Sequence, residues 1–452
     1  MHLKSTQKHT TLQGYKIARV KPSKETLQDI KLASSKIGIT RLSDITSLDK
    51  LHMPNYSAVL PGTSDSIWVY GGKGLTRTDA KVSALMEAIE RHSSLGNTYS
   101  GTIIQGSYTQ LSKTHEYVLR PDEVVESTVS FDDYAILDYL VGYDLVSCQN
   151  VLVPAEIALH KYIPTKPAAY AFSHSHTNGL ASGNTIEEAI SHALCEVIER
   201  DALSIADLCS SSIGYNILCK IENEISLSAP FRNIPLTIGD KFVDDPSIFP
   251  DVDITETDSE AVRIILRRFN DAGLSILVKD VTQYDIGVTT FAASSMEWIT
   301  HDYGYFARGC GTHPDSETAL IRALTEVSQT RAANVQGARD DLRKIRYDDR
   351  DKITDRKWQF MRSTVSSAKG RPKSDVRFDK IKSCRNQDIL DDINYILNQL
   401  KKVGLRSIVV DLTNPSIGIP VVRVIVPGLE TFQVTSSVMG ERAKEYFRKL
   451  HS

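Results

Sequence analysis

Alanine and glutamate recur with the same spacing in three stretches of the chain. In each stretch two alanines lie four positions apart, a glutamate follows three positions later, and another polar residue follows three positions after that. Positions three and four apart share one face of a helix, so each stretch predicts a helix with a ridge of small residues beside a polar pair. Copies of a unit at such separations indicate a repeated structure packed around a shared centre. The three stretches are Gly72–Arg91, Gly183–Arg200 and Ala319–Arg331.

A second hydrophobic pattern occurs twice. An amphipathic helix is followed by a glycine that can end it, then by an apolar run typical of a buried strand, and then by a second apolar run that returns beside the first. The sequence therefore predicts a mixed α/β (α+β) fold, in which helix–strand modules are repeated and the acidic helices pack on one side of a mixed sheet. The expected elements are helices at 261–269 and 389–402, strands at 276–282 and 408–413, and returning strands at 291–293 and 421–426.

The pattern also divides the chain into regions. Residues 1–56 are expected to be a separate N-terminal leader region, and residues 57–341 a core that holds the repeated acidic helices. Residues 342–385 are dense in charges of both signs and predict an excursion from the core. A solvated loop is the simpler interpretation of this excursion, while a lid or a docking surface for a partner remains open. Residues 386–452 are expected to form a C-terminal helix–strand–strand module.

Convergence of the three acidic helices would bring five carboxylates together. Like charges raise each other's pKa, so the group can stay ionised only if cations lie between its members. Oxygen ligands suit hard divalent cations, and magnesium commonly shares its coordination shell with substrate phosphates, whereas neither Cys nor His recurs in the motif to bind a softer metal. The alternative is three solvent-facing helices whose Glu–Arg pairs contribute little, but the agreement among three copies favours a metal site. The predicted metal ligands are Glu87, Glu90, Glu196, Glu199 and Glu326.

Glycine-rich segments precede the first two acidic helices and indicate a phosphate site. Gly71–Gly74 follows a predicted strand at 66–70, and there backbone N–H groups, the helix N-terminus and the charge of Lys73 could attract an anion. Leu180–Asn184 repeats the arrangement, with Asn184 placed as an N-cap. Neither segment is a Walker sequence and each is a weak signal alone, so the prediction of a magnesium–nucleotide site depends on finding two of them.

Two further side chains lie one helical turn before a predicted metal ligand. Ser83 precedes Glu87 and offers a hydroxyl to phosphate, and Arg322 precedes Glu326 and would face the same cavity.

Two other candidates for chemistry are weaker. Cys310, on a glycine-rich turn expected before the third acidic helix, could carry sulfur if the helix N-terminus lowered its pKa. A small residue that fills a tight turn is the simpler interpretation. His174 and His176 would share one face of a strand, but no third ligand stands at a telling distance, so a hydrogen-bonding role is favoured over a zinc site.

The spacing and order of these motifs resemble those of the YcaO superfamily. The resemblance extends from about residue 71 to at least residue 341. It implies the YcaO fold around a central nucleotide site, ATP and Mg²⁺ as cofactors, and activation of a backbone amide in a peptide or protein. The motifs are Gly72-Lys-Gly-x-Thr76, Ser83 through Glu87 to Glu90-Arg91, Ser182-Gly-Asn-Thr through Glu188-Ala189, Glu196 through Glu199 to Arg200, and Glu326 through Gln329 to Arg331.

The resemblance also implies roles for individual residues. Glu87 and Glu196 would act with Arg200 where phosphoryl transfer occurs, and Arg200 would stabilise the transferring charge. Besides Lys73 and Arg322, the implied nucleotide contacts are Ser83, Asn184, Glu188, Arg200 and Gln329.

Three segments, 37–46, 329–341 and 419–430, resemble the branch of this superfamily that works with a TfuA partner protein in thioamidation. The chain also ends at Glu445–Ser452 without the proline-rich tail of many azoline-forming members. This resemblance implies a thioamide product, with thioglycine expected, and it implies a sulfur donor, a TfuA-like partner and a homodimer. The best-known members of the branch modify the α-subunit of methyl-coenzyme M reductase, although related pairs modify other peptides. An azoline-forming cyclodehydratase and a nucleotide-binding scaffold without turnover remain alternatives.

The composition excludes several other classes of protein. Charged residues make up 24% of the chain and hydrophobic residues 41%, as in ordinary soluble proteins, and the net charge of −3 leaves no basic surplus for nucleic acid. No apolar run is long enough to span a membrane, and the first residues lack the core of a signal peptide. Six scattered cysteines without a Cys-x-x-Cys pair fit reduced thiols. We therefore expect a cytoplasmic protein with neither nucleic acid nor a membrane as a partner.

Overall fold

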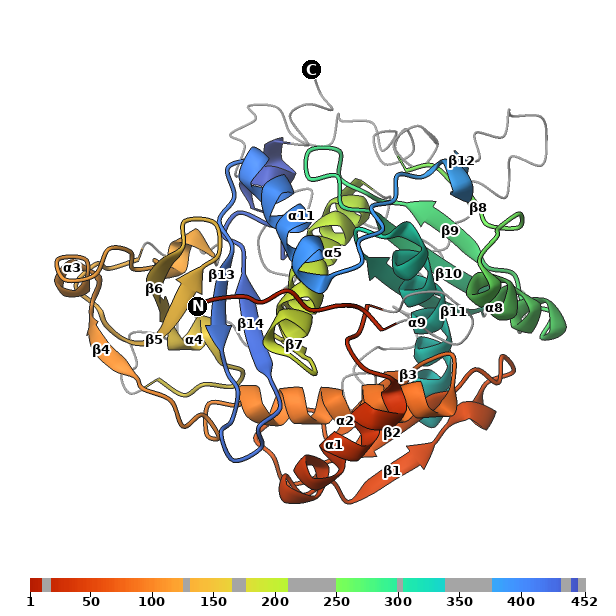
Figure 1. The fold of residues 1–452 in the computed structure, drawn as a ribbon, viewed down its shortest axis with the longest axis horizontal. Coiled ribbons are helices and arrows are strands. Elements are labelled where there is room, and N and C mark those ends of the chain that lie inside the picture. The colour runs from red at the N-terminus through yellow and green to blue at the C-terminus, as the bar shows by residue number, and fades with distance from the viewer. Residues whose placement is uncertain are drawn as a thin grey trace, which may run out of the picture.

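The fold is built from three α/β modules, each of which contains one of the three acidic helices (Figure 1). The computed structural model describes residues 1–9, 18–124, 131–164, 176–209, 249–298, 304–337, 376–431 and 440–445. All statements about structure below refer to these residues.

The first module is continuous in sequence and consists of a helix, a three-stranded antiparallel sheet and an acidic helix. Its elements are α1 (Ser23–Lys36), β1 (Arg41–Asp44), β2 (Asn55–Val59), β3 (Val69–Lys73) and α2 (Arg77–Ser94). Helices α1 and α2 pack against each other, and Ile30 of α1 is buried in one cluster with Tyr56 of β2 and Ala84 of α2. The expected leader region 1–56 therefore contains α1 and β1, and its boundary falls inside β2.

The third module has the same order of elements. They are α8 (Glu260–Asp271), β9 (Leu277–Asp280), β10 (Thr290–Trp298), β11 (Gly304–Thr312) and α9 (Ser316–Gln336). The strands again form an antiparallel sheet in the order β9-β10-β11, and α9 packs on it.

The second module combines two segments that lie far apart in the sequence. One segment supplies β7 (Leu180–Ser182) and α5 (Ile186–Cys209), and the other supplies α11 (Ile389–Lys402), β13 (Ile408–Asp411) and β14 (Val421–Ile425). Strand β14 pairs with both β13 and β7, so the order β13-β14-β7 repeats the order β9-β10-β11. The expected C-terminal helix–strand–strand module is thus completed by β7 and α5.

The remaining elements extend the sheet of the second module. Strand β5 joins β13 to β4 and also pairs with β6, which builds the lobe on the left of Figure 1. A short parallel pair, β8 with β12, lies near α8. These elements are β4 (Ile104–Ser107), α3 (Tyr108–Leu111), β5 (Ile136–Asp144), β6 (Gln149–Pro154), α4 (Ala155–Ala158), β8 (Val252–Asp253) and β12 (Val376–Arg377), with 3₁₀ turns at 46–48, 121–123 and 378–380.

Glycines in the strands allow the acidic helices to approach their sheets closely. A Cβ atom on Gly72 of β3 would lie 2.1 Å from the backbone nitrogen of Ala84 in α2. A Cβ atom on Gly311 of β11 would lie 2.0 Å from the backbone oxygen of Ala319 in α9. These separations are far inside van der Waals contact, so only glycine fits opposite the alanine ridge of each helix. The prediction that Gly71–Gly74 forms a phosphate loop is therefore wrong in its placement, because Gly71 and Gly72 lie within β3.

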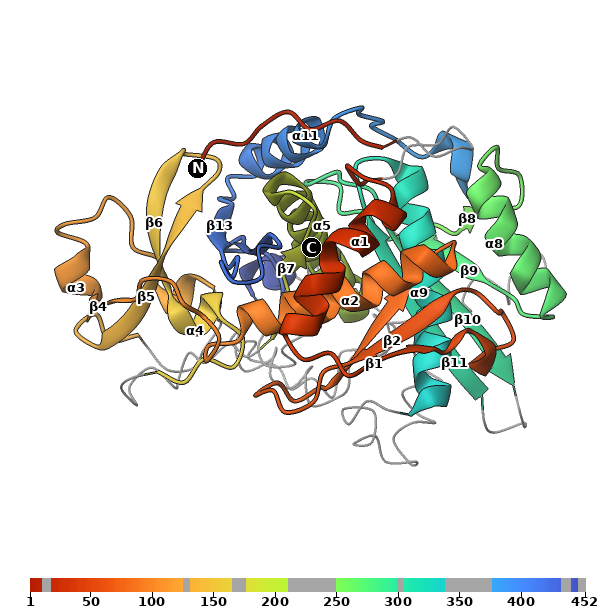
Figure 2. The ribbon, with the colours of Figure 1, turned by 60° about the horizontal axis from the view of Figure 1, so that its bottom comes forward.

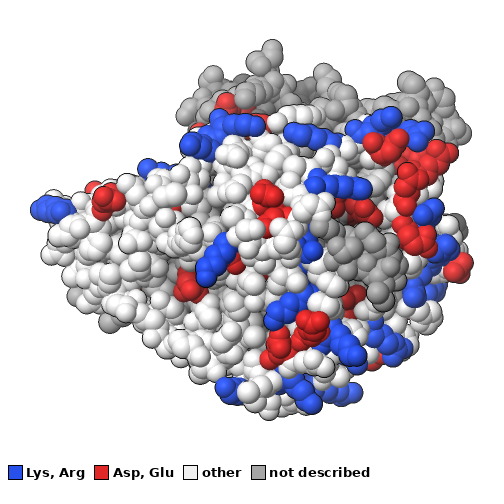
Figure 3. Space-filling model, viewed as in Figure 1, with Lys and Arg blue, Asp and Glu red and all other residues white. Residues whose placement is uncertain are grey.

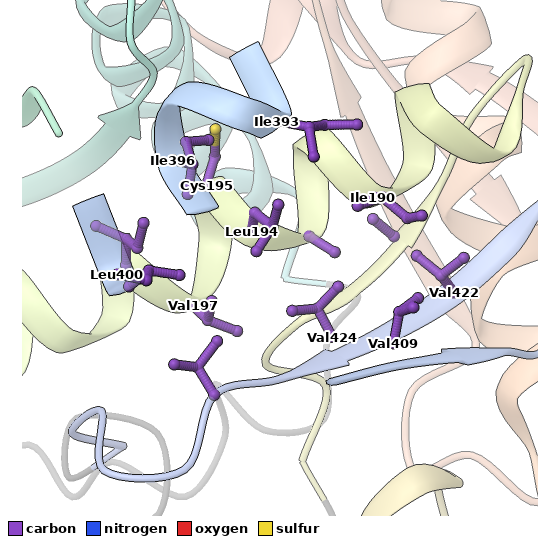
Figure 4. Packing of buried hydrophobic residues seen from close by; sticks show 14 of the residues in the cluster. Ile190, Leu194, Cys195, Val197, Ile393, Ile396, Leu400, Val409, Val422 and Val424 are labelled. Atoms are coloured by element: carbon purple, nitrogen blue, oxygen red, sulfur yellow. The ribbon is translucent and has the colours of Figure 1, made fainter. Parts of the chain in front are cut away.

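Helix α5 forms the centre of the largest apolar core (Figure 4). It lies between α11 on one side and β13 with β14 on the other, so that Leu194 and Ile190 of α5 are buried with Ile393 of α11 and Val424 of β14. The amphipathic patterns predicted for α8 and α11 are confirmed, because their apolar faces supply buried residues to separate cores. Gly273 and Gly404 follow these helices with φ of +65° and +75°, the left-handed conformation expected of a glycine that ends a helix.

The N-terminal segment 1–9 passes the start of α11 (Figures 1 and 2). The Thr6 backbone N–H donates to Asp388 at 2.8 Å, and the Lys4 backbone N–H donates to Glu187 at the start of α5 at 2.9 Å. Lys8 forms a buried ion pair with Asp392 of α11. This segment therefore connects α5 and α11, while the expected excursion 342–385 lies mostly outside the described residues.

The charge of the surface and the polarity of the helices are relevant to the expectation that neither nucleic acid nor a membrane is a partner. On the face seen in Figure 3, acidic and basic side chains are interspersed, and the lobe that carries α3 and β4 is largely uncharged. In the described part of the chain, every helix is too short or too polar to cross a bilayer.

Candidate active site

The three acidic helices share one register, which is set by their N-caps. Thr76 and Thr185 each accept a hydrogen bond from the backbone N–H three residues later, and Asp315 accepts one from the N–H of Glu317. Asn184, which was predicted to be the second N-cap, lies one residue outside that position. Counting from each cap, the eleventh residue is Glu87, Glu196 or Glu326, and the fourteenth is Glu90, Glu199 or Gln329.

Contacts between modules bring these helices to a common centre. Each acidic helix touches a strand of another module as well as its own sheet: α2 touches β7, α5 touches β11, and α9 touches β3. Each of these strands leads into the acidic helix of its own module. The end of a strand that leads into one acidic helix therefore lies beside the acidic helix of another module.

Glu90 of α2 is held by the strand that leads into α5. Its Oε2 atom accepts hydrogen bonds from the backbone N–H of Ser182 at 3.0 Å and from the Ser182 hydroxyl at 3.4 Å. Burial raises the pKa of Glu90 well above its ordinary value, and the negative charges of Glu196 and Glu87 raise it further. Carboxylates from α2 and α5 are thus close enough to repel one another.

Glu196 and Glu199 lie one turn apart on α5 with Arg200 beside both. The guanidinium of Arg200 is 3.8 Å from a carboxylate oxygen of each glutamate. Burial raises the pKa of Glu196 to about 7, against the opposing effect of Arg200. The pKa of Glu199 is also raised, by burial and by the charge of Glu326. The predicted group Glu196, Glu199 and Arg200 is therefore assembled, with Glu199 buried and the side chains of Glu196 and Arg200 partly exposed.

Lys73 connects the end of β3 to the glutamate of α9. Its Nζ atom lies 2.5 Å from Oε2 of Glu326. Burial would raise the pKa of Glu326, but the positive charges of Lys73 and Arg200 outweigh burial and lower it. The ammonium group of Lys73 therefore lies directly beside a predicted metal ligand.

Asn184 and Glu188 form a separate hydrogen-bonded group at the start of α5. The Asn184 side-chain amide donates to both carboxylate oxygens of Glu188 at 3.1 Å, and the Thr26 hydroxyl of α1 donates to Asn184 at 2.9 Å. Glu188 also accepts hydrogen bonds from the Arg19 guanidinium at 3.0 Å and from the Val20 backbone N–H at 3.2 Å. These two predicted nucleotide contacts are held together with residues from before and within the first module.

The other predicted nucleotide contacts lie on the same helices. Arg322 donates to the backbone oxygen of Thr312 at 3.0 Å, and Ser83 is half-buried on α2. The Gln329 side-chain nitrogen would lie 2.7 Å from a Cβ atom on Gly71, so it packs directly on β3.

The chemistry of the donor set fits a hard divalent cation. Among the described residues, no three His, Cys, Asp or Glu side chains form a ready-made metal-binding group. The carboxylates instead lie beside Lys73 and Arg200, which offset part of their charge. All five predicted ligands offer carboxylate oxygen, and the repulsion of neighbouring carboxylates adds to burial in raising the pKa of Glu90 and Glu199. The chemistry therefore suits Mg²⁺ better than a soft metal.

Sequence reasoning missed Arg423 as a member of the site. Arg423 lies on β14, is 1% exposed, and donates to the backbone oxygen of His176 at 3.0 Å. Burial lowers its pKa to about 10, against the opposing attraction of Glu196 and Glu90. A single arginine within the apolar run 421–426 was the available signal, because a buried strand rarely accepts an unpaired charge.

The structure corrects the expectation for Cys310 and shows a hydrogen bond at His176, one of the two paired histidines. Cys310 lies within β11 and not on a turn, and burial raises the pKa of its thiol to about 12. A thiol with a raised pKa is a poor nucleophile, so the weaker alternative, a thiol pKa lowered by a helix N-terminus, is contradicted. His176 accepts a hydrogen bond from the Asn178 backbone N–H at 3.1 Å, as its favoured hydrogen-bonding role requires, while His174 lies outside the described residues.

Two relatives match nearly the whole chain. An uncharacterized protein of Methanothermobacter thermautotrophicus is 34% identical over 433 residues, which cover 94% of this chain and 98% of that protein. An uncharacterized protein in the tfuA 3′ region of Rhizobium leguminosarum bv. trifolii is 29% identical and covers 87% of this chain and 84% of its own.

Solved structures share the fold. YcaO from Methanopyrus kandleri, bound with AMPPCP and Mg²⁺, has a TM-score of 0.65 at 22% identity and covers 93% of this chain and 95% of its own. A heterocyclase in complex with substrate and cofactor has a TM-score of 0.70 at 21% identity over 96% of this chain. This chain spans 54% of that heterocyclase, about half of its length.

A family model agrees with the site and the fold. The YcaO model, described as a cyclodehydratase that binds ATP and Mg²⁺, matches residues 71–430, which include all three acidic helices. On this match and on the relative with 34% identity, the chain belongs to the YcaO family, whose cofactors are ATP and Mg²⁺.

Proposed function

We propose that this protein uses ATP and Mg²⁺ to activate a backbone amide of a peptide or protein, which a sulfur donor converts into a thioamide. The observation that carries the proposal is the meeting of carboxylates from three modules beside Lys73 and Arg200. The relative in the tfuA 3′ region supports thioamidation as the outcome.

The residues of this chain have distinct tasks in the proposal. The metal ligands would be Glu87, Glu90, Glu196, Glu199 and Glu326, with Mg²⁺ neutralising the triphosphate when bound. Lys73 and Arg200 now lie beside three of these carboxylates and would exchange them for phosphate oxygens once metal is bound. The nucleotide would also contact Ser83, Asn184, Glu188, Arg322 and Gln329.

The oxygen of an amide is a poor leaving group, and phosphorylation converts it into a good one. Addition of a sulfide nucleophile to the amide carbon forms a C–S bond and places the electron pair of the C=O bond on oxygen. That oxygen takes the γ-phosphoryl group, ADP departs, and the C–O bond then breaks with the electron pair leaving on phosphate. Loss of the proton from sulfur completes the thioamide. Arg200 would stabilise the charge of the phosphoryl group during transfer, and the enclosed carboxylates would hold the reacting groups in place.

The finer details of the proposal concern partners. We propose a TfuA-like protein as the partner that supplies or positions the sulfur donor, and thioglycine as the product, with the methyl-coenzyme M reductase α-subunit as one candidate target. A homodimer is the proposed assembly. The relative in the tfuA 3′ region supports the partner, and the rest follows from the family resemblance.

The mass of a target peptide tests the reaction. The protein would be incubated with a glycine-containing target, a TfuA-like partner, sulfide, ATP and Mg²⁺. Thioamidation makes the target heavier by the difference between a sulfur and an oxygen atom. Glu87→Gln and Glu196→Gln should abolish this change and the accompanying ATP hydrolysis, while Glu260→Gln, an exposed glutamate on α8, should not.

Cyclodehydration is the second candidate, because the family model describes a cyclodehydratase. Loss of one water from the target, without sulfide, would favour it and contradict thioamidation. ATP binding without turnover in the presence of every partner would contradict both reactions and leave a nucleotide-binding scaffold.

A further inference from the structure

His192 stands at a position that the other two modules fill with predicted nucleotide contacts. Seven residues after the N-caps Thr76 and Asp315 come Ser83 and Arg322, and seven residues after Thr185 comes His192. Each of the three precedes the first predicted metal ligand of its helix by one turn. Sequence reasoning passed over His192, because histidine does not recur at the equivalent positions of the other helices.

The packing of the modules directs His192 toward the common centre. On α5 it lies one turn after Glu188 and one turn before Glu196, on the face that carries both carboxylates. Its electrostatic neighbours come from other segments of the chain: Arg322 of α9, Lys73 of β3, Arg19, and His313. An imidazole on a helix surface directed to solvent would not have basic neighbours from three such segments.

The basic groups around His192 lack sufficient anions among the described residues. Lys73 is paired with Glu326, and Arg19 with Glu188. Arg322 makes hydrogen bonds to neutral groups, the backbone oxygen of Thr312 and the thiol of Cys195, and forms no ion pair in the described part of the chain. The His192 side chain makes no hydrogen bond to another described residue. Arg322 and His192 are thus two hydrogen-bond donors at equivalent positions, and neither has an anionic partner within hydrogen-bond distance among the described residues.

The charge state of His192 suits a phosphate ligand beside metal-binding carboxylates. Burial, followed by the positive charges of Arg322, Arg19, Lys73 and His313, holds the pKa of His192 well below its ordinary value. The ring is therefore neutral near pH 7 and can donate one N–H without a salt bridge to the nearby glutamates.

We propose that His192 donates a ring N–H to an oxygen of the β- or γ-phosphate of ATP, beside Arg322. Magnesium bound by the neighbouring glutamates would bridge these same phosphates, so a residue one turn from Glu196 reaches the terminal part of the nucleotide. The inference rests on the proposed function, since it assigns a further residue to its nucleotide site.

Nucleotide binding tests the assignment without requiring turnover. The dissociation constants of a non-hydrolysable ATP analogue and of AMP, each with Mg²⁺, would be measured by calorimetry for the wild type, His192→Ala and His192→Gln. His115→Ala is the matched control, because His115 is exposed at a loop away from the centre. We expect His192→Ala to weaken binding of the ATP analogue by about tenfold or more, the usual effect of losing a hydrogen bond to a charged group, and to leave AMP binding unchanged.

The conservative variant His192→Gln separates a ligand from a structural residue. The glutamine side chain that it introduces can place an amide N–H near the position of Nε2, so it should restore part of the affinity for the ATP analogue. Unchanged binding of the analogue by His192→Ala would overturn the proposal, as would an equal loss for the analogue and AMP. If the wild type binds the analogue but turns over no ATP with its partners, the proposed function fails and the assignment of His192 stands. If the wild type turns over ATP and both variants bind the analogue normally, only the assignment fails.

Discussion

Lys73 of β3 and Glu326 of α9 form an ion pair across 253 residues of sequence, with Nζ and Oε2 2.5 Å apart. The pair joins the first and third modules at the point where carboxylates from three helices meet. Because a positive side chain lies beside a predicted metal ligand, Lys73 offsets part of the carboxylate charge at this point. Both side chains remain about a quarter exposed, 23% and 27%, so a phosphate or a metal ion can replace either partner.

Replacement of Lys73 should affect nucleotide binding more than stability. We expect Lys73→Met to raise the KM for ATP about tenfold or more, because a hydrogen bond to a charged phosphate is lost. The free energy of unfolding should change by less than about 1 kcal/mol, since partly exposed ion pairs contribute little. Steady-state ATP hydrolysis and denaturant unfolding measure the two effects. Lys50→Met is the control, because Lys50 pairs with Glu297 outside the site and is 62% exposed. An unchanged KM for Lys73→Met would contradict the assignment of Lys73 to phosphate.

Glu156 should make the stability of the protein depend on pH. It lies on α4, is 4% exposed, and neither of its carboxylate oxygens has a hydrogen-bond partner among the described residues. Burial, with a smaller effect from Asp138, raises its pKa from the ordinary 4.5 to about 7. The protonated form is therefore favoured in the folded state. Its stabilising effect is present below about pH 4.5 and is lost as the pH rises through about 7.

The variant Glu156→Gln isolates this effect. At pH 8 it should stabilise the fold by up to about 3 kcal/mol, because the amide removes the need to bury a charge. At pH 5 the change should be small, since the carboxyl group is already protonated in the folded protein. Thermal unfolding at both pH values measures the difference. An equal change in Tm at pH 5 and pH 8 would show that Glu156 is not the titrating group.

Gly311 should tolerate no side chain. A Cβ atom there would lie 2.0 Å from the Ala319 oxygen and 2.7 Å from the Ala323 nitrogen, both in the backbone of α9. We expect Gly311→Ala to destabilise the protein by about 3 kcal/mol or more, because strand and helix must move apart. Gly337→Asn is a suitable comparison, since Gly337 has φ of +61°, which asparagine adopts readily, and nothing lies within 4 Å of its added Cβ. Chemical denaturation of both variants measures the difference, and similar stabilities would contradict the close approach of β11 to α9.

Asp201 should anchor the segment 440–445 to α5. Its carboxylate is fully buried, and it accepts hydrogen bonds from Arg442 at 3.0 Å and from the Glu430 backbone N–H at 2.9 Å. Asp201→Asn should cost about 2 kcal/mol of stability, because the charge-assisted hydrogen bonds from Arg442 to Asp201 are weakened while the ion pair of Arg442 with Asp285 remains. The exposed pair of Arg377 with Asp379 supplies the control, and Asp379→Asn should change stability by less than about 1 kcal/mol. Limited proteolysis should also cut the Asp201→Asn variant more readily near residue 440 if the anchor is lost.

The local patterns of the sequence predicted the acidic helices and the two repeated helix–strand pairs, but not α1, β1, β2 or the strands β4–β6. The alanine–glutamate spacing predicted α2, α5 and α9, and the amphipathic runs predicted α8 and α11, because helical periodicity and glycine at a helix end act over a few residues. The convergence of the glutamates could also be inferred, since three copies of one motif imply a shared centre. The role of the glycines could not be predicted in the same way. A glycine in a phosphate loop and a glycine under a helix look alike until the opposing backbone is known.

The sequence by itself determined the repeated helices, their register and the acidic residues that each contributes. Only the tertiary structure decided how β7 and α5 join α11, β13 and β14 into one module. It also decided which basic side chains lie beside the glutamates, that Arg423 lies near Glu196 and Glu90, and that His192 lies near Arg322 and Lys73. The physical reason is that helix spacing depends on neighbours within one turn. Burial and charge at the centre depend instead on residues that the chain brings together from hundreds of positions apart.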